Sequence, residues 1–213
     1  MRLTGKRKVA GMTAPLLADA AALFTGHEAT REAALGRFRL DLYYPALKLA
    51  FEYDGPEHYC EVGHIERDER KGEACERQEI TLRRWPYYFQ LTRDVAKYMF
   101  AGFYSDYKYA QAISLVYGAK DERDVLAPGL HKSKCTPANF VHRGANRFFR
   151  EIDDAPSSVR SQVIRSFQLY LAHLGPSRGW LLLPEHDSRF RVFMERPPEA
   201  EHLNCYFPNL MTT

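Results

Sequence analysis

The sequence predicts a mixed α/β protein, with a mixed sheet flanked by helices and a largely helical C-terminal extension. Two kinds of segment support this prediction. Residues 36–54 and 80–85 have the length and patterning of strands, whereas the longer segments around them carry helix caps or helical spacing. A hydrophobic fraction of 45% over 213 residues is enough for one good core and a small second one.

Charge and cysteine content narrow the class of protein. A net charge of +3 permits nucleic-acid binding without requiring it. The four cysteines form no CxxC pair, which indicates reduced thiols in a cytoplasmic protein and argues against a disulfide framework or a zinc site. No apolar run approaches the roughly 20 residues of a membrane span, so no membrane association is expected.

The first helix is predicted from Thr13 to Phe24. Thr13 is suited to capping the helix, and Pro15 falls in the first turn, where proline is tolerated. Gly26 provides a common helix stop. The basic residues at 2–8 indicate a solvated tail or, alternatively, an arm that contacts the DNA backbone.

Two strands are predicted next, over 36–44 and 47–54. Strand side chains alternate between the two faces of a sheet. Asp41 therefore lies on one face of the first strand, while Glu52 and Asp54 share one face of the second. Together the three carboxylates form a candidate site for a divalent metal.

The register of this hairpin decides how close the carboxylates come. If the prolyl-alanine spacer is a two-residue loop, Tyr44 pairs with Leu47 and Asp41 lies diagonal to Glu52. Diagonal neighbours sit roughly 7–8 Å apart, near enough for two carboxylates to share Mg²⁺, which prefers carboxylate oxygens and waters. A plain salt-bridged sheet is the alternative, because three cations share this face: Arg37, Arg39 and Lys48.

The residues after the second strand add chemistry. Gly55 allows a sharp turn, and His58 is placed to deprotonate a water near neutral pH. A charged helix is predicted over 64–78, and a short strand over 80–85. The helix pairs opposite charges at helical spacing: Glu66 with Arg70, and Asp68 with Lys71.

Three more helices are predicted towards the C-terminus. The first lies within 91–104 and has Thr92 as its cap, and the second covers 105–117 and stops at Gly118. The third begins near Pro156 and has core positions at helical spacing: Val159, Val163, Phe167 and Leu171. A hairpin is predicted over 180–194. The domain boundary is placed at 104, which separates 1–104 from an extension over 105–213, with the polar stretch that begins at Ala119 as the alternative boundary.

A resemblance to a known family is carried by the run FRLDLYYPALKLAFEYDGPEHY, followed by RDERK and ITLRRW. These residues resemble the compact branch of the PD-(D/E)XK nuclease superfamily, which includes relatives of the very-short-patch mismatch-repair endonuclease. The resemblance covers residues 28–85 and implies a restriction-endonuclease-like core. The matching positions are Asp41, Glu52, Asp54, Gly55, His58, Arg67, Asp68, Lys71, Leu82 and Arg83.

The resemblance implies roles for these residues. Asp41, Glu52 and Asp54 would bind Mg²⁺, for which Mn²⁺ can substitute. The superfamily's usual lysine, two positions after the glutamate, is replaced here by Asp54, so His58 or Lys71 would take the proton-transfer role. The family also tends to have a helical glutamate before the first strand, for which two candidates exist: Glu28 and Glu32.

A second informative stretch runs from 131 to 150 and contains no acidic residue. Cations neutralise phosphates, and interleaved aromatics can reach bases, so this stretch predicts a DNA contact. A basic surface whose phenylalanines are core is the alternative. The predicted DNA-binding residues are Lys132, Lys134, Arg143, Arg147 and Arg150, together with Arg67 and Arg83.

The leading functional prediction is a Mg²⁺-dependent DNA endonuclease acting on duplex DNA, such as a type II restriction endonuclease or a repair nuclease. The extension would recognise sequence or form a dimer interface, and a homodimer or a partner subunit is expected because two strands must be cut. The alternatives are a catalytically silent nucleic-acid-binding protein of the same fold, an RNase, and a structural protein that binds no nucleic acid.

Overall fold

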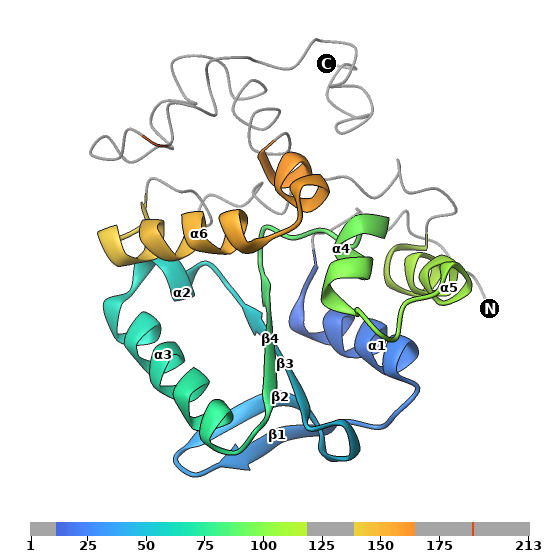
Figure 1. The fold of residues 1–213 in the computed structure, drawn as a ribbon, viewed down its shortest axis with the longest axis horizontal. Coiled ribbons are helices and arrows are strands. Elements are labelled where there is room, and N and C mark those ends of the chain that lie inside the picture. The colour runs from blue at the N-terminus through green and yellow to red at the C-terminus, as the bar shows by residue number, and fades with distance from the viewer. Residues whose placement is uncertain (1–11, 119–138, 165–188, 190–213) are drawn as a thin grey trace, which may run out of the picture.

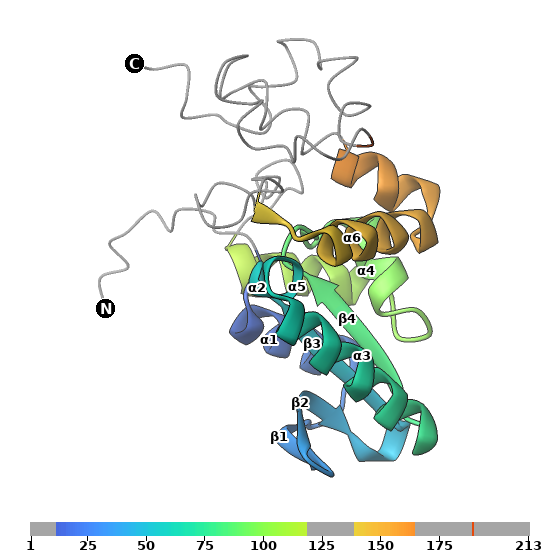
Figure 2. The same ribbon diagram turned by 90° about the vertical axis from the view of Figure 1, so that its left-hand side faces the viewer.

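The computed structural model describes residues 12–118, 139–164 and 189. Within these ranges the protein is a mixed α/β fold, as predicted: a four-stranded sheet with helices on both faces and helical segments after residue 139 (Figures 1 and 2). No helix of the described part is long and apolar enough to cross a bilayer.

The sheet contains strands β1 (Thr30–Leu35), β2 (Phe38–Tyr44), β3 (Leu49–Asp54) and β4 (Thr81–Pro86), in that spatial order. β1 and β2 are antiparallel, as are β2 and β3, whereas β4 runs parallel to β3. The parallel pairing requires a crossover, and helices α2 (Glu57–Cys60) and α3 (Val62–Arg77) provide it. The carboxyl ends of β3 and β4 therefore lie side by side.

β1 corrects one expectation. The resemblance suggested a helical glutamate before the first strand, but Glu28 precedes β1 without helical structure and Glu32 lies within β1 at a φ of 49°. Leu35 pairs with Phe38 across a turn in which Gly36 has a φ of 58°. The segment is extended because β2 offers it a pairing edge.

The register of β2 and β3 was also predicted wrongly. Residues Pro45–Leu47 form a 3-10 turn, η1, and Lys48 follows with a φ of 45°. Because the connection takes four residues where two were expected, Tyr44 pairs with Leu49 and Leu42 pairs with Phe51. This shift brings Asp41 directly beside Glu52 on the sheet.

The helix boundaries set by capping residues are confirmed. α1 (Ala14–Thr25) begins after Thr13, whose Oγ1 accepts from the Leu16 amide at 3.5 Å, and ends at Gly26 with a φ of 69°. α4 (Arg93–Met99) is capped by Thr92. α5 (Asp106–Tyr117) begins after Ser105 and ends at Gly118.

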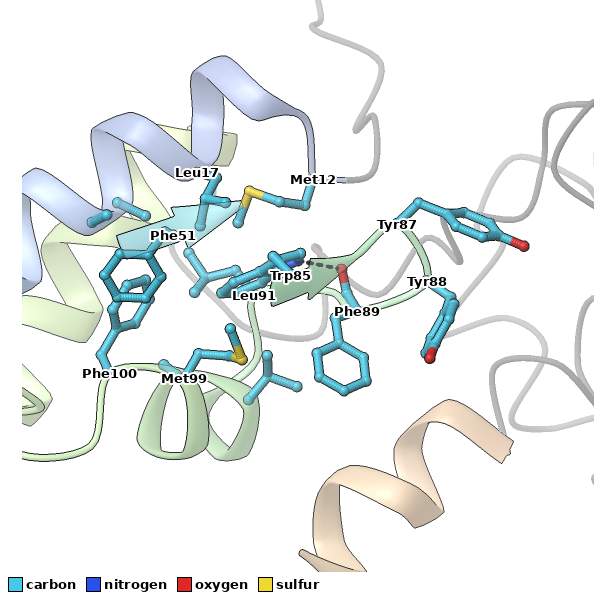
Figure 3. Packing of buried hydrophobic residues seen from close by; sticks show 14 of the residues in the cluster. Met12, Leu17, Phe51, Trp85, Tyr87, Tyr88, Phe89, Leu91, Met99 and Phe100 are labelled. Atoms are coloured by element: carbon cyan, nitrogen blue, oxygen red, sulfur yellow. Dashed lines mark hydrogen bonds between the residues drawn. The ribbon is translucent and has the colours of Figure 1, made fainter. Parts of the chain in front are cut away.

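α1 and α3 cover opposite faces of the sheet (Figure 1). Phe51 points into the larger core, where α1, α4 and α5 pack around Trp85 and Phe100 (Figure 3). Ala50 points the other way, into a smaller core under α3. The alternation along β3 therefore directs Glu52 and Asp54 to the face that α3 covers.

α6 (His142–Asp154) packs on α2 and α3, across the carboxyl end of the sheet (Figures 1 and 2). Gly144 makes this approach possible, because a Cβ there would lie 1.8 Å from the Tyr59 carbonyl oxygen. A further helix follows over 157–164, where Val159 and Val163 are buried as predicted.

Parts of the C-terminal prediction fall outside the described residues. These are Phe167, Leu171 and the predicted hairpin at 180–194. The predicted boundary at 104 stays a prediction, although the larger core contains residues from both sides of it, from Met12 to Val163.

Candidate metal centre

Asp54 ends β3 and is completely buried, with 0% of its surface exposed. Two other side chains converge on it. His58, on α2, places Nδ1 3.5 Å from Asp54 Oδ1, and Asp68, on α3, places Oδ2 2.6 Å from the same nitrogen. One ligand atom from each of the three residues lies within 4.8 Å of the others, so the group could hold a metal ion.

Two guanidinium groups also contact these carboxylates. Arg84, on β4, donates from Nη1 to both oxygens of Asp54, at 3.0 and 3.3 Å. Arg147, on α6, donates from Nη2 to Asp54 and from Nη1 to Asp68 Oδ2, the latter at 2.7 Å. The two carboxylates are thus held by cations contributed from distant parts of the chain.

Arg147 is itself fixed by α6 and α2. Its Nε donates to Glu151 Oε1 at 2.7 Å, and its guanidinium carbon lies 5.0 Å from the centre of the Tyr59 ring. Glu151 Oε2 accepts from the hydroxyls of Tyr59 and Tyr88, at 2.7 and 2.6 Å. Since Arg147 is only 6% exposed, this is a buried polar network rather than a surface ion pair.

A second polar pair lies two residues earlier along β3, on the same face. Glu52, 2% exposed, accepts from Lys71 Nζ through Oε2 and from the Asp41 amide through Oε1, the latter at 3.0 Å. Asp41 Oδ2 accepts from the Tyr53 amide at 2.9 Å. Asp41 is half-buried, and it is not one of the three residues that could hold the metal ion, Asp54, His58 and Asp68.

The environment shifts the pKa values of several groups in this site, among them Glu52, His58 and Asp68. Burial, with the nearby Asp41 carboxylate, raises the pKa of Glu52 despite the Lys71 ammonium. Burial alone would lower the pKa of His58, but its hydrogen bond to Asp68 and the charge of Asp54 raise it. Burial alone would raise the pKa of Asp68, but the His58 hydrogen bond and Arg84 hold it well below its usual range.

Carboxylates outnumber the described cations in and around this network, so a proton on His58 brings its charge closer to balance. Five carboxylates lie in or beside it, Asp41, Glu52, Asp54, Asp68 and Glu151, against the guanidinium groups of Arg84 and Arg147 and the ammonium group of Lys71. Buried charges are costly unless they are paired. A proton or a bound cation is therefore favoured at this end of the sheet.

The structure thus brings together the five predicted catalytic residues. Asp41, Glu52, Asp54, His58 and Lys71 all lie at or beside the carboxyl half of β3. The expected pairing of Asp68 with Lys71 is wrong, because both turn inward to separate partners, His58 and Glu52. Arg70 contacts the Glu66 backbone carbonyl, not its carboxylate.

The predicted DNA-binding residues do not form one surface among the described residues, because they differ in burial and in partners. Arg147 is buried, and Arg83 donates to the Met99 carbonyl. Arg143, which is exposed, pairs with Glu66 and Glu69. Arg67 and Arg150 are exposed. Lys132 and Lys134 lie outside the described residues.

Sequence reasoning did not assign Asp68, Arg84 or Glu151 to the site. For Asp68 a signal existed: it stands three residues before Lys71 in RDERK, and such a pair shares one helix face. No local signal pointed to Arg84 or Glu151.

No family model, no curated protein and no solved structure matches this chain.

Proposed function

We propose that this protein is a metal-dependent nuclease that hydrolyses phosphodiester bonds of DNA, with Mg²⁺ or Mn²⁺ as cofactor. The observation that carries the proposal is the convergence of Asp54, His58 and Asp68 at the carboxyl end of β3. The Glu52–Lys71 pair beside this group adds an ammonium group close to the same carboxyl end of β3.

The residues present fit a divalent cation. Asp68 Oδ1 is buried and accepts no hydrogen bond from the described residues, with Arg84 Nη1 3.5 Å away. Asp54 would supply the second carboxylate. Carboxylate oxygens suit Mg²⁺ and Mn²⁺, whereas an imidazole ligand would favour later transition metals. A metal panel is therefore part of the test.

When bound, a divalent cation polarises a phosphate and lowers the pKa of a coordinated water. The chain's own residues would do the rest. Asp68 Oδ2 orients His58 through Nδ1, so that in the neutral imidazole Nε2 is left to accept a proton. Lys71, held by Glu52, would place positive charge where the phosphate gains negative charge. Asp41 supports Glu52 through its amide.

Arg147 competes with any such cation. Its guanidinium already contacts Asp54 and Asp68 Oδ2, so a cation shared by these carboxylates must displace it or rely on Asp68 Oδ1. Arg84 remains beside both groups. We expect metal affinity to be weaker than three uncompensated ligands would give.

This competition favours one second candidate, a nucleic-acid-binding protein without catalysis. Both oxygens of Asp54 contact guanidinium groups, which is how a purely structural charge network would also be satisfied.

A cleavage screen separates the two functions. Labelled duplex DNA, single-stranded DNA and RNA are incubated with Mg²⁺, Mn²⁺, Zn²⁺ or EDTA, and product ends are mapped. The proposal expects metal-dependent cuts in DNA that Asp54→Asn abolishes. Asp19→Asn, at an exposed position on α1, serves as the matched control and should cut normally. Binding without cutting under every metal would establish the second function, and cuts confined to RNA would identify an RNase.

A further inference from the structure

A pocket on the protein surface lies away from the buried candidate metal centre. This pocket, of about 390 Å³, opens between the β1–β2 turn and the C-terminal half of α3. Its charged lining residues are Arg37, Arg70, Glu73 and Arg77. Three guanidinium groups thus face one carboxylate.

The single carboxylate does not neutralise the pocket. Arg77 Nη1 lies 3.9 Å from Glu73 Oε2, and both side chains are more than half exposed, at 68% and 63%. Ion pairs of this kind contribute little, because water screens them. Two further positive charges, those of Arg37 and Arg70, have no carboxylate partner among the described residues.

The remaining contacts of these arginines leave donors available. Arg70 uses Nε for the Glu66 carbonyl, which holds the stem while the two Nη groups stay uncommitted among the described residues. Arg37 lies over the Phe38 ring, 5.1 Å from its centre. A guanidinium held in this way presents a fork of N–H donors that matches a phosphate.

The floor of the pocket is built on the small core. Leu35 and Ala74 belong to that core, and Phe38 packs against it. Gly36, with a φ of 58°, makes the tight turn that carries Arg37. The arginines therefore project from a turn and a helix whose backbones are fixed by packing, so less ordering is needed when an anion binds.

α3 links the pocket to the candidate metal centre. Asp68 and Lys71 face inward from this helix, while Arg70 and Arg77 line the pocket. The axial distance from Asp68 to Arg77 is about 13 Å at 1.5 Å per residue. A nucleic-acid strand rises about 3.4 Å per nucleotide, so a few nucleotides would span it.

We infer that the pocket lined by Arg37, Arg70 and Arg77 binds backbone phosphates of a nucleic-acid strand whose scissile bond lies at the metal centre. The inference rests on the proposed function for the identity of the polyanion. It assigns DNA contact to a surface that the basic stretch at 131–150 does not include.

The test measures binding without chemistry. Fluorescence anisotropy of a labelled DNA duplex is recorded in EDTA over a salt series, for the full chain and for Arg70→Ala/Arg77→Ala. Each lost phosphate contact lowers the slope of log K against log salt by about 0.9, so the double variant should lose about two units of slope and at least about tenfold in affinity at low salt.

Two controls make the result specific. Arg31→Ala/Lys97→Ala removes the same charge from exposed positions outside the pocket and should change the slope by less than half as much. Arg70→Lys/Arg77→Lys keeps the charge, so it should keep most of the slope while losing affinity. Equal slopes for the two alanine double variants would overturn the inference, provided that circular dichroism shows both folded.

A competition arm identifies the source of the phosphate. Inorganic phosphate at constant ionic strength should displace the duplex only weakly. Complete displacement by millimolar phosphate would assign the pocket to a free anion and overturn the nucleic-acid assignment. Because these measurements need no metal, salt-dependent binding at the pocket without any cleavage would defeat the proposed nuclease activity and leave the pocket in place.

Discussion

Replacing Arg147 by methionine is expected to weaken the metal-free protein and to make its stability depend on metal. Methionine has a similar reach but no charge. The guanidinium is 6% exposed, and its partners Asp54 and Asp68 are 0% and 5% exposed. Solvent therefore screens little of the interaction that the substitution removes.

The size of the loss follows from this burial. Removing one partner of a buried ion pair costs about 3–5 kcal/mol. Arg84 remains beside both carboxylates, so the expected loss in the free energy of unfolding is at the lower end of this range, about 3 kcal/mol. For a protein of this length each kcal/mol corresponds to about 2–4 °C in Tm, so Tm should fall by about 6–12 °C.

Metal should reverse much of this loss. A ligand present at 100 times its Kd stabilises the native state by about 2.7 kcal/mol. The variant frees the oxygens that Arg147 occupies, so Mn²⁺ or Mg²⁺ should stabilise it by about this amount. In the parent protein the guanidinium competes, and the gain should be smaller.

Urea unfolding followed by tryptophan fluorescence, in EDTA and in MnCl₂, measures both effects. Arg143→Met is the matched control on the same helix: its side chain is 46% exposed and its partners are surface glutamates, so a loss within about 1 kcal/mol and no response to metal are expected. If Arg147→Met is equally stable in EDTA and in Mn²⁺, Asp54 and Asp68 do not form a metal site. A loss below about 1 kcal/mol would contradict the buried pairing itself.

Three further results are expected. Asp41→Asn should reduce DNA cutting by at least about 10²-fold while thermal unfolding and anisotropy show folding and binding retained; full activity would exclude Asp41 from the site. Because Asp68 and Asp54 raise the folded-state pKa of His58 above 6.5, its contribution is fully present below about pH 6.5 and is lost as pH rises through the folded-state pKa. Urea titrations in EDTA should show this decline in the parent protein and not in His58→Gln, and identical pH profiles would refute it. Gly144→Ala should cost about 1–3 kcal/mol, since its Cβ would lie 1.8 Å from the Tyr59 carbonyl oxygen; an unchanged Tm would mean that α6 does not pack there.

The elements that sequence predicted well are those with local determinants. Thr13, Thr92 and Ser105 cap their helices through their own hydroxyls, and Gly26 and Gly118 end helices with positive φ. These are short-range effects of side chain and backbone, so a single segment contains all the information that they require.

β1 was missed because its sequence favours another state. TREAAL is rich in good helix formers, yet the segment is a strand because it pairs with β2. Tertiary pairing outweighs such preferences, since strand propensity depends strongly on context. The prediction of the β2–β3 register was wrong for a related reason. The 3-10 turn and the left-handed Lys48 add two residues to the connection between the strands, and proline alone does not specify them.

The sequence predicts only the site residues that lie on β3 and directly after it. Alternation along β3 places Glu52 and Asp54 on one face, and spacing places His58 just beyond. The partners of these groups come from far away in the chain, as Arg147 stands 93 positions after Asp54. No periodicity or spacing links residues so distant, because packing of α6 on α2 creates the contact.

The hydrogen bonds that Glu151 accepts limit how far the chain can be shortened from its C-terminus. This carboxylate serves the hydroxyls of Tyr59 and Tyr88 and the guanidinium of Arg147 at once. A fragment that stops at residue 118 would lack the carboxylate that accepts from both phenols, and it would also lack Arg147, which pairs with the buried Asp54 and Asp68. Truncated versions made for crystallisation or for activity mapping should therefore retain residues 139–154.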